Sequence, residues 1–185
     1  IEHFRVDDIK AQLGNSTSFE GSISMHPLNF EDGYHTLNIK NMRFNYDDLV
    51  NFYIPSSTKT IPLPESLKPM GDSRLALDFK GSYNNFNSHI KLKSGIGDVE
   101  TSIARVNEAS GTNIFSGYID ADRVKAGTIA NATKYVGDLD LDADFAIKFP
   151  QKGNPELSLN GKATNVALLG KNIDKINLNG AMEQN

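Results

Sequence analysis

The chain has 185 residues, a formal net charge of −4 and no cysteine or tryptophan. The lack of cysteine excludes disulfides and thiolate chemistry. Lysine and arginine are scattered singly, so we expect no nucleic-acid partner and no polybasic membrane-surface patch. No stretch approaches the roughly 18 apolar residues of a membrane span, and we expect the segment itself to be soluble.

The first residues, Ile1-Glu2-His3, carry no initiator methionine and no signal-peptide pattern, which is typical of a segment of a longer protein. We treat residues 1–185 as a single β-rich segment. Its first 45 residues predict three strands with somewhat irregular alternation: Phe4–Leu13, Phe19–Met25 and Tyr34–Phe44.

Helical content is predicted to be small. Between Asn45 and Tyr53 the apolar residues recur at helical spacing, Asn45 can cap the amino end and Pro55 ends the run. Residues 64–70 can add one further turn, and residues 126–134 are a third, weaker candidate. We expect these one to three short helices to cap an end of a sheet.

The rest of the chain shows the period-2 alternation of a sheet with one dry face and one wet face. The clearest case is 137–149, where Leu139 to Phe149 alternate with aspartates; thirteen residues at about 3.3 Å each would span about 43 Å. Further strands are predicted at 71–83, 86–93, 96–106 and 113–123, and around Leu157 and Ile176. Short turn signals such as Ser94-Gly95 separate them, which favours one long antiparallel meander.

Candidate chemistry is sparse. Asp138, Asp140, Asp142 and Asp144 suggest calcium, but residues two apart on a strand lie about 6.7 Å from each other and do not converge. A solvated strand face is the better interpretation. The four histidines show no metal-ligand spacing, and no nucleophile elbow or phosphate-binding loop occurs. We therefore predict no catalytic residue, no metal site and no cofactor.

The apolar stripe is the remaining candidate. The default interpretation of such a face is burial against a second sheet or a helix. The alternative is a curled sheet whose concave face stays partly open to hold acyl chains or a client polypeptide, since each methylene removed from water contributes about 0.8 kcal/mol.

Nine short segments between residue 47 and residue 180 follow one another in an order that resembles the order in a known family. The segments are Asp47-Asp48-Leu49, Ile61–Leu67, Met70–Ser82, Asn85-Phe86, Gly95–Val99, Phe115–Asp120, Val136–Leu141, Leu157–Gly161 and Asn172–Gly180. In this order, residues 46–185 resemble the Bacteroidetes branch of the TamB family (translocation and assembly module), within the wider AsmA-like group.

The resemblance implies a periplasmic protein tethered to the inner membrane, with a taco-shaped, β-helix-like sheet and an apolar interior. It also implies phospholipid passage between membranes, or outer-membrane protein assembly with an outer-membrane barrel partner. The residues expected to line the groove for acyl chains are Leu75, Leu77, Phe79, Ile90, Leu92, Phe115, Ile119, Leu139, Leu141, Phe145, Ile147, Leu157 and Leu159.

Two other functions stay open at this point. A closed β-sandwich or barrel would have a filled interior and act as a binding or adhesion module through its loops, without a lipid role. A carbohydrate-active enzyme is less favoured, because neither clustered aromatic residues nor a convergent acid pair is evident.

Overall fold

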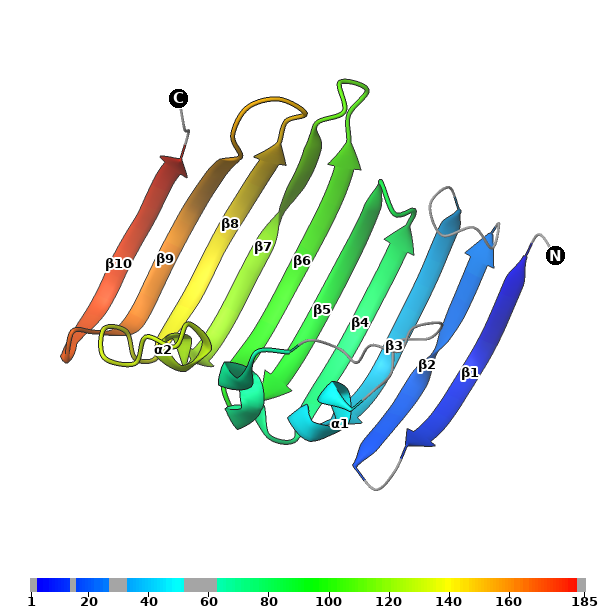
Figure 1. Cartoon of the computed structure of the whole chain (residues 1–185), viewed down its shortest axis with the longest axis horizontal. Coiled ribbons are helices and arrows are strands. Elements are labelled where there is room, and N and C mark those ends of the chain that lie inside the picture. Colours follow the sequence, from blue (N-terminus) through cyan, green and yellow to red (C-terminus); the bar gives the residue numbers. More distant parts are fainter. Residues whose placement is uncertain (1–2, 14–15, 27–32, 52–62, 183–185) are drawn as a thin grey trace.

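Ten strands follow one another across one antiparallel sheet in the order of the chain (Figure 1). The computed structural model describes residues 3–13, 16–26, 33–51 and 63–182. The strands are β1 (Phe4–Leu13), β2 (Thr17–His26), β3 (Tyr34–Phe44), β4 (Ser73–Gly81), β5 (Phe86–Ser94), β6 (Gly97–Asn107), β7 (Asn113–Val124), β8 (Leu139–Phe149), β9 (Glu156–Leu168) and β10 (Lys171–Met182). The sheet is not closed, because β1 and β10 do not pair with each other.

The predicted long meander is therefore confirmed. The short turn after Ser94 shows why: Ser94 pairs with Gly97 across a two-residue turn, and Gly97 adopts a positive φ of 123°. Glycine reaches this conformation without steric strain. Because β1 and β10 do not pair with each other, the sheet is not the closed barrel that was an alternative prediction from the sequence. The described residues also contain no second sheet, as a β-sandwich would.

On one face, apolar residues stand in register from strand to strand. One row runs through Ala11, Phe19, Met42, Leu75, Leu92, Val99, Ala121, Leu141, Ala163 and Ile176. Three parallel rows pass through Leu77, Phe79 and Phe115. Alternation on each strand thus produces four mainly apolar rows across the whole sheet.

Bulges keep this register where the alternation slips. Ala121 and Val124 lie three apart on β7, yet they face Leu141 and Leu139, which lie two apart on β8. The extra residue is accommodated at Arg123, whose φ is 51°. A β-bulge of this kind returns the next side chain to the same face and increases the local twist.

Three short helical segments cover one end of the sheet. They are α1 (Tyr46–Val50), the 3-10 helix η1 (Glu65–Met70) and α2 (Ala126–Ile129). Asn45 caps α1 as expected by accepting a hydrogen bond from the Asp48 amide at 2.8 Å. The last predicted positions of this helix, Phe52 and Tyr53, lie outside the described residues. The 126–134 prediction was too long, since α2 ends at Ile129.

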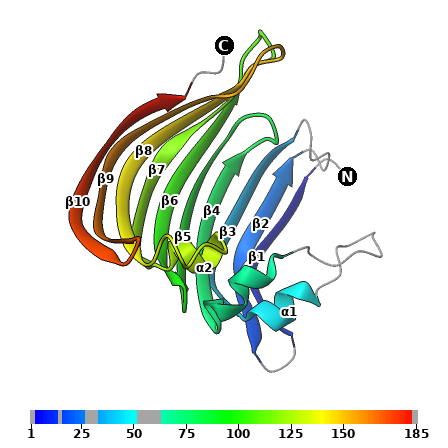
Figure 2. The same ribbon diagram turned by 60° about the vertical axis from the view of Figure 1, so that its left-hand side comes forward.

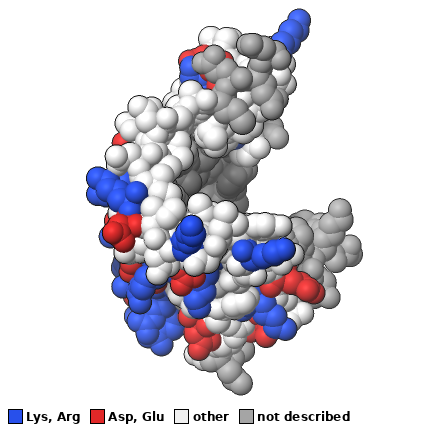
Figure 3. All heavy atoms as spheres, turned by 90° about the vertical axis from the view of Figure 1, so that its left-hand side faces the viewer, with Lys and Arg blue, Asp and Glu red and all other residues white. Residues whose placement is uncertain are grey.

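The sheet is strongly curved, and the helices lie on its concave side near one end (Figure 2). There α1 and η1 pack on Met42, Leu75 and Leu92, so the apolar rows belong to the concave face. Viewed from the β10 side, the molecule is hollowed on this face (Figure 3). The fold is the curled sheet with an apolar concave face that the sequence predicted.

Candidate functional site

The concave face is the strongest candidate for a functional site. All thirteen residues predicted to line a groove lie on it: three in each of the four rows, and Leu139 beyond the bulge opposite Val124. Rings of neighbouring strands meet there, with Phe79 and Phe86 centroids 5.1 Å apart and Phe115 and Phe149 centroids 5.9 Å apart. We call these four rows the apolar trough.

The thirteen residues are partly exposed, and all but Leu75 and Leu92, which pack against the helix-end core, stand apart from that core. Each of the thirteen is half-buried, being neither fully enclosed nor fully exposed. Side chains packed between the sheet and the helices are more enclosed: Phe44 at the end of β3 and Met70 of η1 are 6% and 7% exposed. Away from the helices, no other described element packs over the trough.

One end of the trough is closed by a small core. Phe44, Tyr46, Met70 and Ile96 are buried together there. Backbone hydrogen bonds fasten this end: the Gly95 amide donates to the Met70 carbonyl at 2.7 Å, and the Lys125 amide to the Ile96 carbonyl at 2.9 Å. Among the described residues, the trough is thus capped at the helix end.

The floor of the trough is shaped by small residues on β7 to β9. Ala121, Ala143 and Ala163 are 4%, 1% and 6% exposed, and Gly117 and Gly161 stand in the neighbouring rows. Their low exposure means that larger side chains around them cover these alanines. The small residues therefore lie at the bottom of the trough on these strands.

Sequence reasoning missed a charged member of the trough, Arg105. It pairs with Phe86 on one side and Phe115 on the other, so its side chain lies on the concave face in the row of Phe115. The signal was present, because Arg105 shares the parity of Val99 and Ile103 along β6.

The convex face carries the charges. Cross-strand ion pairs join Lys91 to Glu100 at 2.9 Å and Lys162 to Asp142 at 3.0 Å. The pKa of Asp142 is lowered, first of all by its hydrogen bond from Lys162. The aspartates of 138–144 therefore belong to the polar face, as expected, and among the described residues no group of three or more acidic or histidine side chains is arranged to hold a metal.

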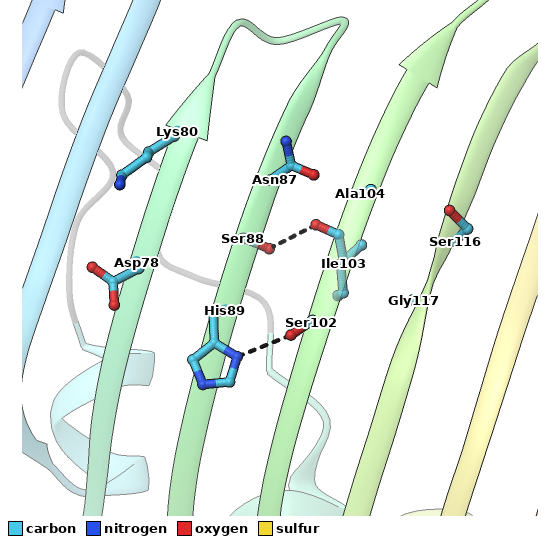
Figure 4. A pocket seen from close by; sticks show the side chains of 10 residues that line it. All are labelled: Asp78, Lys80, Asn87, Ser88, His89, Ser102, Ile103, Ala104, Ser116 and Gly117. Carbon is cyan, nitrogen blue, oxygen red and sulfur yellow. Dashed lines mark hydrogen bonds between the residues drawn. The ribbon is translucent and has the colours of Figure 1, made fainter.

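A pocket of about 380 Å³ lies on the convex face (Figure 4). Beside it, Ser102 Oγ lies 3.0 Å from His89 Nδ1, and His89 Nε2 lies 3.1 Å from Glu100. This contact order resembles a Ser-His-acid relay. However, Ser102 sits in β6, which is paired on both sides, so the surrounding backbone amides are engaged in the sheet and cannot stabilise an oxyanion. We interpret it as a surface hydrogen-bond network.

No helix within the described ranges is long and apolar enough to cross a membrane. No family model, curated protein or solved structure matches the chain. The resemblance to the TamB family therefore stays a prediction, and function has to be inferred from the concave face.

Proposed function

We propose that this chain is a lipid-binding segment of a bacterial envelope protein, whose apolar trough holds the acyl chains of phospholipids and conducts them between membranes or supports outer-membrane protein assembly. The observation that carries the proposal is the half-burial of aligned apolar residues across ten strands with no covering layer among the described residues. The order of TamB-like segments supports it and suggests a periplasmic location, an inner-membrane anchor on the parent protein and an outer-membrane barrel partner.

The free energies of burial and of ligand immobilisation favour long acyl chains as the ligand. Ten methylenes taken out of water contribute about 8 kcal/mol, which is comparable to the roughly 4–15 kcal/mol cost of immobilising a ligand. Short chains would therefore bind poorly, whereas a phospholipid with two long chains exceeds the cost. No polar motif is required for such binding, in agreement with the lack of catalytic motifs in the sequence.

The first test is lipid co-purification. Mass spectrometry of organic extracts from the purified chain should detect bound phospholipid at a near-constant ratio to protein. An extract without lipid, even after the protein has been incubated with phospholipid micelles, would refute the proposed function.

The second test places a charge in the trough. In Phe145→Asp we expect the fold to survive and lipid retention to fall several-fold, because Phe145 is half-buried rather than enclosed. Ala146→Asp, on the convex face of the same strand, is the matched control and should retain lipid. Circular dichroism reports folding. A Phe145→Asp protein that unfolds would indicate an ordinary core, and one that folds with unchanged lipid binding would contradict the trough.

A further inference from the structure

Arg105 places a positive charge inside a face that is otherwise almost free of charge. Among the residues of the four rows, only His35 and Arg105 are ionisable, and both lie in the row of Phe115. This row is at the end of the trough opposite the helices, where the β4–β5 and β6–β7 turns lie (Figure 1). His35 is only 3% exposed, whereas Arg105 is half-buried.

The Arg105 guanidinium is held in a fixed position. Its Nη1 donates to the Tyr83 carbonyl at 2.8 Å and its Nη2 to Asn113 Oδ1 at 2.7 Å. The Cζ atom lies 4.5 Å from the Tyr83 ring centroid and 5.3 Å from that of Phe115. Two neutral acceptors and two aromatic rings orient the group without neutralising its charge.

No carboxylate of the described chain compensates this charge. The ion pairs all lie on the convex face or in its bulges, and none includes Arg105. A guanidinium has five N–H donors. Nη1 and Nη2 of Arg105 each use one hydrogen here, and its Nε is enclosed, which leaves two Nη hydrogens on the planar group to meet the oxygens of a phosphate. The chemistry of this end of the trough therefore fits a phosphate group.

The trough length favours a phosphate that carries acyl chains. From the row of Arg105 to that of Leu75, beside the helix-covered core, there are three steps of two residues, or about 20 Å. Half of a bilayer's hydrocarbon core is about 15 Å thick. An acyl chain of one leaflet's length therefore fits along the strands between Arg105 and the helices.

We propose that Arg105 binds the phosphate of a phospholipid headgroup at the open end of the trough and so fixes the lipid with its acyl chains pointing toward the helices. This inference rests on the proposed function and specifies its ligand. A lipid that keeps its chains but lacks the phosphate would lose the contact.

The test compares two lipids with the same acyl chains. The 185-residue chain is incubated with dodecyl maltoside micelles holding equal amounts of dioleoyl phosphatidylglycerol and dioleoylglycerol, repurified, and extracted for mass spectrometry. We expect about tenfold enrichment of phosphatidylglycerol, as one hydrogen bond to a charged group provides. Equal retention of both lipids would overturn the role of Arg105 and leave the trough standing, whereas retention of neither would refute the trough itself.

Three variants assign the preference to Arg105. Arg105→Gln should keep total lipid and lose the enrichment. Asn113→Asp should lose the enrichment as well, because the new carboxylate neutralises the guanidinium while Arg105 stays in place. If Arg105→Gln fails to fold, Asn113→Asp still tests the role of Arg105. Arg74→Gln removes one exposed positive charge on the convex face and should behave as wild type.

Enrichment that persists in Arg105→Gln or in Asn113→Asp would overturn the proposal, as would an equal loss in Arg74→Gln. Competition with inorganic phosphate completes the test. Displacement of bound phosphatidylglycerol by millimolar phosphate would assign Arg105 to a soluble anion and overturn its assignment to a lipid headgroup.

Discussion

Asp140 is a residue on the polar face that maintains the shape of the apolar one. Its carboxylate accepts hydrogen bonds from the Arg123 amide at 2.7 Å and from Asn165 Nδ2 at 2.6 Å. Arg123 and Asn165 stand on the two strands that flank β8, and both have a positive φ, of 51° and 52°. Asp140 thus stabilises two strained backbone positions on neighbouring strands at once.

We expect Asp140→Ala to lower the free energy of unfolding by about 1–2 kcal/mol, because the bulge at Arg123 and the positive-φ position at Asn165 lose a shared acceptor. Chemical denaturation monitored by circular dichroism measures this. Asp144→Ala, at an exposed position on the same face of β8, is the control and should change stability by less than about 0.5 kcal/mol. Equal effects of the two substitutions would contradict this role of Asp140.

The same carboxylate gives a pH dependence. The Arg123 amide, followed by Asn165, holds the pKa of Asp140 below its ordinary value in the folded chain. A lowered folded-state pKa stabilises the protein above the unfolded value of about 3.9, and this contribution is lost as the pH falls through the folded pKa. Denaturation between pH 6 and pH 3 should therefore show a shallower acid slope in Asp140→Asn than in wild type.

At the level of the strands, most of the fold could be predicted from the sequence. Alternation and turn residues locate all ten strands, and β1 and β3 have the predicted bounds. The bulges could not be predicted, because the three-residue step from Ala121 to Val124 resembles a break in the pattern, and the positive φ at Arg123 depends on Asp140 of another strand. The position of the helices depends on tertiary contacts that no local pattern encodes.

The residues of the trough could be predicted from the sequence, but whether the trough is covered could not. Parity along each strand indicates which residues share a face, and all thirteen expected residues do so. Whether that face is covered depends on elements distant in sequence, and alternation is equally consistent with a sandwich core. Arg105 has the parity of its apolar neighbours on β6, but a charged residue is not expected on an apolar face, and its pairing with Phe86 and Phe115 places it there.

Gly117 on β7 lies where the backbone of β6 approaches closely. A Cβ atom at this position would lie 1.9 Å from the Ser102 carbonyl oxygen, so the neighbouring strand approaches too closely for any side chain. We expect Gly117→Ala to reduce the free energy of unfolding by about 1–3 kcal/mol. Gly180→Ala is the control, since it occupies the same row with nothing within 4 Å. Denaturation curves in which both variants match wild type would contradict this interpretation of Gly117.

On the scale of the whole molecule, each strand pairs with its neighbours in sequence and makes most of its contacts with them. Such a sheet resembles a repeat protein, in which stability is approximately a sum of nearest-neighbour terms. The two outer strands, β1 and β10, each have a single partner. Opening should therefore begin at the edges.

Native-state hydrogen exchange tests this expectation. We expect amide protection to be highest in β5 to β7 and to decline toward β1 and β10, because a central strand can open only together with the strands on one side of it. Equal protection in all ten strands would indicate a single cooperative unit and contradict the nearest-neighbour description. Protection should also rise in the central strands when phospholipid is bound.

The open edges have a geometric consequence as well. A closed barrel fixes its strand number, since adding a strand changes its radius, its tilt and the shape of its interior. An unclosed meander has no such constraint. Each additional hairpin extends this sheet by about 9.6 Å at the usual strand spacing while leaving the cross-section unchanged. In this architecture, the reach of the protein can be altered simply by the number of hairpins it contains.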